Sequence, residues 1–168
     1  MSQTPGIIDD RTWPAILPPA LERFIAYWRA LPPAAGGVPP KAAVDPLQIP
    51  RQLLPHIGLV EAQPDGDLRS GGRLNLRFRL LGTGHRRATG RDYSRRRFDD
   101  LYTPEQVLAF EREYRAILLG GQPSFARRSS LKLNREFIVF QRVLAPLLDE
   151  CDRPRHVIGY WHWENFES

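Results

Sequence analysis

The segment LNLRFRLLGTG, residues 74–84, has the alternating pattern of a β-strand with one buried face. Its apolar side chains recur at every second position, and polar residues separate them. A period of two places alternate side chains on opposite faces of a sheet. We therefore predict a strand over Leu74–Leu81 whose inward residues are Leu74, Leu76, Phe78 and Leu80.

Four other segments are predicted to be strands, and short polar connections join several of them. They are Ile57–Ala62, Ser124–Leu133, Phe137–Leu144 and His156–Trp163. The sequence Gln63-Pro64-Asp65-Gly66, which precedes Leu74–Leu81, is strong turn chemistry. Connections this short favour antiparallel hairpins over helical crossovers.

An amphipathic helix is predicted before the first strand, over Ala20–Leu31. Its apolar residues recur at three- and four-residue steps, and a Pro/Gly-rich linker over 32–40 ends it. The sequence Asp45-Pro46-Leu47-Gln48 then predicts the start of a short helix that runs to about Leu54.

Further helical patterns separate the second strand from the third. Short helical turns are expected between residues 82 and 102. The sequence Thr103-Pro104-Glu105-Gln106 predicts a capping box that opens a longer helix over 104–119. Gly120-Gly121 is expected to end that helix.

This order of elements predicts the α+β class, with a five-stranded antiparallel sheet, a helical insert and an extra N-terminal amphipathic helix. We expect three parts: a tail over 1–17, a helix with its linker over 18–40, and one domain over 41–168.

Composition excludes several classes of protein. The chain has 168 residues, of which 42% are hydrophobic and 26% charged, as in a globular domain. No apolar run is long enough to span a membrane, and residues 1–5 lack the features of a secretory signal. Cys151 is the single cysteine, so no internal disulfide can form. A cytoplasmic domain is expected.

Several short motifs together resemble PAS domains, in particular bacterial stand-alone PAS proteins. Residues 77–84, RFRLLGTG, resemble their YRLxGT-like second strand. Asp45-Pro46 with Leu53-Leu54-Pro55 resembles their DP…LLP lead-in. Residues 89–92 with 98–101 resemble a TGxD…L turn, and Pro146-Leu147 is in keeping with the end of the fourth strand. The resemblance spans about residues 20–163, and it implies a sensory or regulatory binding module that is cytoplasmic and commonly dimeric.

The same resemblance bears on cofactors, although it leaves their identity unknown. Haem-binding relatives usually take an axial histidine from the long helix, and 104–119 contains none. Flavin photoreceptor relatives carry a reactive cysteine, whose place Tyr93 holds here. We therefore expect neither haem nor cysteinyl-flavin photochemistry, and no spacing of residues predicts a metal site.

The predicted interior lies between the long helix and the sheet, and it is either filled by side chains or open to a small ligand. Tyr114 would recognise a polar ligand group, because a buried hydroxyl needs a partner. The candidate pocket residues are Leu76, Phe78, Leu80, Phe110, Tyr114 and Ile117.

A cluster of arginines is the chief electrostatic feature of a chain whose net charge is +5. It would bind phosphates or carboxylates, which makes a nucleic-acid or anionic-surface binder the alternative function. Pairing with Asp92, Asp99 and Asp100 would instead neutralise it. The members of the cluster are Arg86, Arg87, Arg91, Arg95, Arg96 and Arg97.

The predicted fourth strand is apolar on both faces, so both must be covered. The helical insert would cover one face. The N-terminal helix, or a second copy of the chain, would cover the other. Candidate homodimer contacts are Phe24, Trp28, Trp161 and Trp163.

No motif for catalysis is present, so the sequence predicts a protein that is not an enzyme. Since no output region is recognised on the chain, a separate signalling protein is the expected partner. A scaffold used only for oligomerisation is a further hypothesis.

Overall fold

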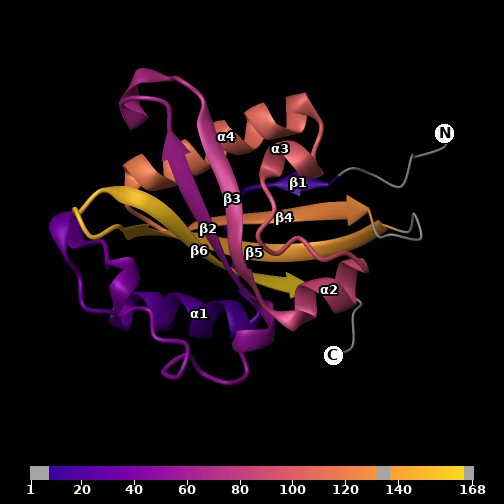
Figure 1. Cartoon of the computed structure of the whole chain (residues 1–168). Helices are drawn as coiled ribbons and strands as arrows, with labels where there is room; N and C mark the ends of the chain where they lie inside the picture. The colour runs from indigo at the N-terminus through magenta and orange to yellow at the C-terminus, as the bar shows by residue number, and fades with distance from the viewer. Residues whose placement is uncertain (1–7, 132–136, 165–168) are drawn as a thin grey trace.

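The computed structural model describes residues 8–131 and 137–164, and its centre is one antiparallel sheet (Figure 1). The strand order is β1-β4-β5-β6-β2-β3. The bounds are β1 Asp9–Asp10, β2 Ile57–Pro64, β3 Leu74–Leu81, β4 Ser124–Leu131, β5 Phe137–Leu148 and β6 Pro154–Trp163. The five predicted strands and the α+β class are confirmed, except that residues 132 and 133 of the predicted strand Ser124–Leu133 lie outside the described residues.

A sixth strand was not predicted, and it comes from the N-terminal tail. Asp9 and Asp10 form β1 and pair with Arg128 and Arg127 at the edge of β4. Aspartate is depleted in strands and two residues are too few for an alternating pattern, so the pairing with β4 accounts for this extended segment.

Helices cover the two faces of the sheet from opposite sides (Figure 1). The bounds are α1 Pro19–Ala30, α2 Thr83–Thr89, α3 Phe98–Leu101 and α4 Pro104–Gly120. Leu21, Phe24 and Trp28 of α1 pack on one face, and the indole of Trp28 donates a hydrogen bond to the Pro146 carbonyl. The insert from α2 to α4 covers the other face. No described helix is long and apolar enough to cross a membrane.

Strand β5 contributes to both apolar layers, as its sequence predicts. Val143, Ala145 and Leu147 face α1, whereas Ile138 and Leu144 face the insert. Each layer is therefore covered within a single chain, and the alternation along β5 sets which side chains reach the insert.

The capping signals of α4 are confirmed. The Thr103 hydroxyl accepts a hydrogen bond from the Gln106 amide, and the Gln106 side chain accepts one from the Thr103 amide. Gly121 ends the helix in the left-handed region, with φ of 71°.

The predicted helix from Asp45 to about Leu54 is wrong. Residues 46–53 form turns, and only Leu54–His56 is a 3-10 turn, labelled η3. The Asp45 carboxylate does accept a hydrogen bond from the Leu47 amide, but Pro50 follows within one helical turn. Proline inside a helix removes an N–H donor and clashes with the preceding turn.

A β-bulge moves Leu80 off the inner face, so its placement in the pocket is wrong. Val60 pairs with Phe78, but the next pair joins Leu59 to Leu80, which leaves Arg79 as the extra residue. One additional residue reverses the alternation. Leu80 is accordingly 49% exposed, and Leu81 takes the inward position.

Glu111 and Arg115, which the four-residue spacing suggests are on the wet side of α4, bind the β2–β3 hairpin instead. The Glu111 carboxylate is buried and accepts hydrogen bonds from the Leu74 amide and the Arg73 guanidinium. Arg115 donates to the carbonyls of Leu68 and Gly72. These contacts fix the height of α4 above the sheet.

Candidate ligand-binding cavity

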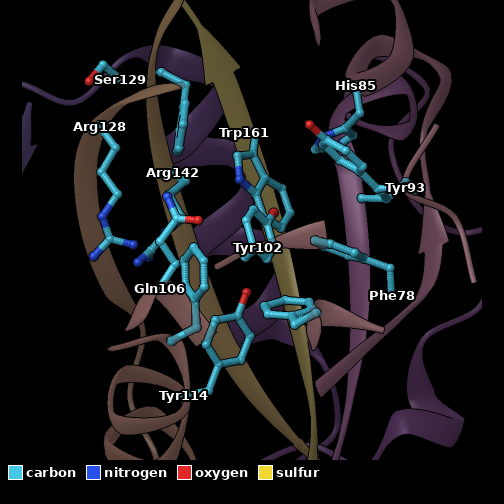
Figure 2. A pocket seen from close by; sticks show the side chains of 14 residues that line it. Phe78, His85, Tyr93, Tyr102, Gln106, Tyr114, Arg128, Ser129, Arg142 and Trp161 are labelled. Carbon is cyan, nitrogen blue, oxygen red and sulfur yellow. The ribbon is translucent and has the colours of Figure 1, made fainter. Parts of the chain in front are cut away.

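A cavity of about 370 Å³ lies between the sheet and the helical insert (Figure 2). Strands β3, β4, β5 and β6 supply one side, and α2, α4 and the segment between them supply the other. This volume falls within the usual range for small-molecule sites. The structure therefore shows an open interior where the sequence allowed either outcome.

Aromatic rings form one wall of the cavity. The ring of Phe78 lies 4.7 Å from that of Phe98 and 6.2 Å from that of Tyr93, centroid to centroid. The rings of Tyr102 and Phe110 lie 4.8 Å apart. Offset and edge-to-face rings hold one another in place, so this wall is a rigid apolar surface.

Two arginines form the opposite wall, Arg128 from β4 and Arg142 from β5 (Figure 2). Glu113 of α4 accepts hydrogen bonds from both guanidinium groups. Arg142 is only 3% exposed and Glu113 only 6%. A carboxylate and a guanidinium group are thus buried together, with the less deeply buried Arg128 beside them, at the edge of a mostly apolar cavity.

Electrostatics keep Glu113 ionised. Burial alone would raise its pKa, but hydrogen bonding to Arg128 and the charges of Arg142, Arg128 and Arg11 outweigh burial and lower it. Glu113, Arg128 and Arg142 then carry two positive charges and one negative charge. Burial also lowers the pKa of Arg142, because a cation removed from water is destabilised.

The N-terminal segment contacts the same group of charges from outside. Asp9 accepts a hydrogen bond of 2.8 Å from the Arg128 Nε, and the Arg11 Nε lies 3.4 Å from the Glu113 carboxylate. The cavity wall and strand β1 therefore share one ion-pair network.

Tyrosine hydroxyls supply neutral polar groups. The Tyr114 side chain is buried, and its hydroxyl points toward the middle of the cavity (Figure 2). Burial raises the pKa of Tyr114 and of Tyr102 above the ordinary value, so both remain protonated at neutral pH. Within the described residues neither hydroxyl has a hydrogen-bond partner.

His85 of α2 lies at the cavity in a neutral state. Its Nε2 is 3.2 Å from the His56 carbonyl, and its ring meets Trp161 edge-on at 4.8 Å. Burial lowers its pKa to about 4, so it carries no charge at neutral pH.

The predicted pocket residues divide into three groups. Phe78, Phe110 and Tyr114 line the cavity. Leu76 and Ile117 are buried in the same core but do not border the open space. Leu80 lies outside the cavity, because the bulge in β3 turns its side chain to the exposed face.

Sequence reasoning missed the charged wall altogether. Arg142 interrupts a strand that is otherwise apolar over most of its length, and this was a signal that could have been used. A charged residue in a doubly covered strand needs a buried partner, and Glu113 on the long helix is that partner.

The arginine cluster lies outside the cavity, on α2 and the loop that follows. All six of its members are exposed. Arg97 pairs with Asp99 at 3.1 Å, and Asp99 also binds Arg73. In the described part of the chain the other five form no ion pair, although hydrogen bonding and, to a smaller extent, the charge of Arg86 lower the pKa of Asp92, so direct pairing with an aspartate is limited to Arg97.

The candidate dimer residues lie on opposite faces of the sheet. Phe24 is fully buried and Trp28 is 5% exposed, both under α1. Trp161 and Trp163 lie under the insert, and Trp161 lines the cavity. Side chains buried this deeply within one chain have little surface left for a second copy.

The residues present do not suit cysteinyl-flavin chemistry. Tyr93 lines the cavity at the place that the resemblance assigns to the reactive cysteine. Cys151, the chain's single cysteine, is exposed in the turn between β5 and β6. Across the described ranges no group of three or more metal-ligating side chains occurs.

Comparisons with known proteins agree with this architecture. A family model described as PAS domain matches residues 16–162. A search of the curated proteins gave no match.

Several solved structures are similar to the chain. A Rhodobacter sphaeroides LOV protein is 15% identical over 89% of this chain and 69% of its own, with a TM-score of 0.44. The PAS domain of Bordetella pertussis BvgS is 21% identical over 70% of this chain and 84% of its own, with a TM-score of 0.33. An RNA-binding light-oxygen-voltage receptor is 17% identical over 78% of this chain, with a TM-score of 0.45, and the chain spans only 35% of its length.

Proposed function

Because the chain belongs to the PAS domain family, we propose that it is a sensory or regulatory module that binds a small molecule in the cavity between sheet and insert. The observation that carries this proposal is the joint presence of open volume, a rigid aromatic wall and polar groups without partners. A filled core can also contain packed rings, but it has no open volume and rarely has buried polar groups without partners. Convergent polar groups in an apolar pocket are typical of ligand sites.

We propose that this chain has no catalytic activity of its own, because PAS domains are generally sensory rather than catalytic. It would act in the cytoplasm and pass its signal to a separate protein. Homodimerisation remains a prediction, and Phe24 and Trp28 could contribute to it only if α1 left the sheet.

The bulge in β3 provides a matched test of the cavity. The probe is N-phenyl-1-naphthylamine, a neutral dye that fluoresces in apolar surroundings. We expect the wild-type protein to bind it and Leu81→Trp to weaken binding about tenfold or more, because the indole would fill the space that Leu81 borders. Leu80→Trp, one residue earlier on the exposed side, should bind as the wild type does.

Thermal unfolding of both variants shows whether they are folded. If Leu81→Trp does not fold, Phe140→Trp fills the cavity from β5 and replaces it. No binding by the wild type, or binding that neither cavity-filling variant weakens, would refute a small-molecule site at this place.

Five unpaired, exposed arginines favour a second candidate function, the binding of nucleic acid. Should they contact phosphates, affinity for a short duplex would fall about a hundredfold or more between about 50 and 200 mM salt. The double variant Arg95→Ala, Arg96→Ala should weaken binding at low salt. The control Arg23→Ala, Arg29→Ala removes two exposed charges from α1. Absence of binding at the lower salt concentration would dismiss this function.

A further inference from the structure

We propose that the cavity is built for an aromatic carboxylate, a ligand with one negative charge that binds Arg142 and Arg128. This inference rests on the proposed function, because it names the class of ligand for the same cavity. The polar wall, the charge balance and the shape of the apolar wall each support it.

Hydrogen-bond donors remain available on the polar wall. A guanidinium has five N–H donors. In the described part of the chain, Arg142 uses one toward Glu113 and one toward the Ser124 carbonyl at 3.5 Å, and Arg128 uses three toward Glu113 and Asp9. Both side chains border the cavity. Guanidinium groups that line the cavity and keep unused N–H donors are suited to bind a carboxylate.

The charge balance favours one negative charge rather than two. Three arginines of the network, Arg11, Arg128 and Arg142, face two carboxylates, Asp9 and Glu113, which leaves an excess of one positive charge. An excess charge that involves buried groups is costly. A carboxylate brings one negative charge and neutralises it, whereas a phosphate monoester brings up to two and would leave an excess.

The remainder of the ligand must suit a wall of rings. Phe78 and Tyr93 offer flat apolar surfaces across the cavity from the arginines (Figure 2), and Phe110 also lines the cavity. Flat aromatic groups stack on such walls more closely than branched or strongly hydrated groups do. The Tyr114 hydroxyl lies between the two walls and can donate to the ligand (Figure 2).

Displacement of N-phenyl-1-naphthylamine tests the inference with three probes of similar shape: 2-naphthoate, its neutral amide 2-naphthamide, and 2-naphthyl phosphate. We expect the wild type to bind 2-naphthoate about tenfold or more tightly than the amide, and the phosphate no more tightly than 2-naphthoate. Arg142→Gln and, separately, Arg128→Gln should each remove most of this preference and change affinity for the amide less than about threefold. Arg86→Gln, which removes an exposed charge outside the cavity, should change nothing.

The outcomes separate the inference from the function beneath it. If the dye does not bind in the cavity, the proposed function fails and the inference fails with it. If the dye binds but acid and amide displace it equally well, the small-molecule site stands and the inference is overturned. A preference that survives both arginine substitutions, or tenfold tighter binding of the phosphate, also overturns it. Because Arg128 is nearer the surface, its variant retains the test if Arg142→Gln does not fold.

Discussion

Replacement of Glu113 by glutamine is expected to lower the free energy of unfolding by about 3–5 kcal/mol, or the melting temperature by about 10 °C. The carboxylate is 6% exposed and lies between the guanidinium groups of Arg128 and Arg142. Without it, the buried Arg142 has no anionic partner, and Arg128 keeps only the half-exposed carboxylate of Asp9. Breaking a buried ion pair costs far more than breaking an exposed one, because the remaining charge stays out of water.

A surface residue in a similar arrangement serves as the control. Asp99 also lies between two arginines, Arg73 and Arg97, but all three side chains are substantially exposed. Asp99→Asn should therefore cost no more than about 1 kcal/mol in chemical denaturation. Equal losses for the two variants would mean that the Glu113 network is not buried as described.

The pH dependence of the same variant follows from the lowered pKa of Glu113. A carboxyl whose folded-state pKa is depressed stabilises the fold above its unfolded pKa, near 4.5, and loses that contribution as pH falls toward the folded value. The difference in stability between wild type and Glu113→Gln should be constant at neutral pH and shrink below about pH 4.5. A difference that instead grows as the solution is acidified would contradict this account.

Local signals predicted the elements that depend on neighbouring residues. The capping box at Thr103, the glycine stop at Gly121 and the alternation of Leu74, Leu76 and Phe78 all appear in the structure. Each is decided within a few residues of the chain. The helix predicted after Asp45 does not form, and the reason is also local. Pro50 lacks the N–H donor that a continuing helix needs, and the capping signal at Asp45 does not compensate for this.

The cavity depended on contacts distant in sequence, so it was predicted less well. The bulge that exchanges Leu80 for Leu81 appears only when β3 is aligned with β2. The charged wall joins Arg142 to Glu113, which lies 29 positions away on another element. Trp161 looked like an interface residue because alternation defines two faces without saying which one the insert covers.

Gly82→Ala is the second large expected effect, a loss of about 3 kcal/mol in the free energy of unfolding. A Cβ at this position would lie 2.3 Å from the Pro55 carbonyl oxygen and 2.4 Å from that of Leu54. Both obstacles are backbone atoms of the 3-10 turn η3, so no side chain can rotate to relieve them. The glycine of the LLGTG segment is thus required by the contact between the start of α2 and η3.

The matched control for this variant is Gly120→Ala, also glycine to alanine but with no atom within 4 Å of the added Cβ. Gly120 is the last residue of α4, where alanine is the better helix former, so stability should be unchanged or rise by up to about 1 kcal/mol. Leu81 directly precedes Gly82, His85 follows it by three residues, and both border the cavity. Gly82→Ala should therefore also weaken binding of the naphthylamine dye. Chemical denaturation and dye titration of the two proteins measure both effects. If the two variants had the same free energy of unfolding and the same affinity for the dye, the close contact between the start of α2 and η3 would be contradicted.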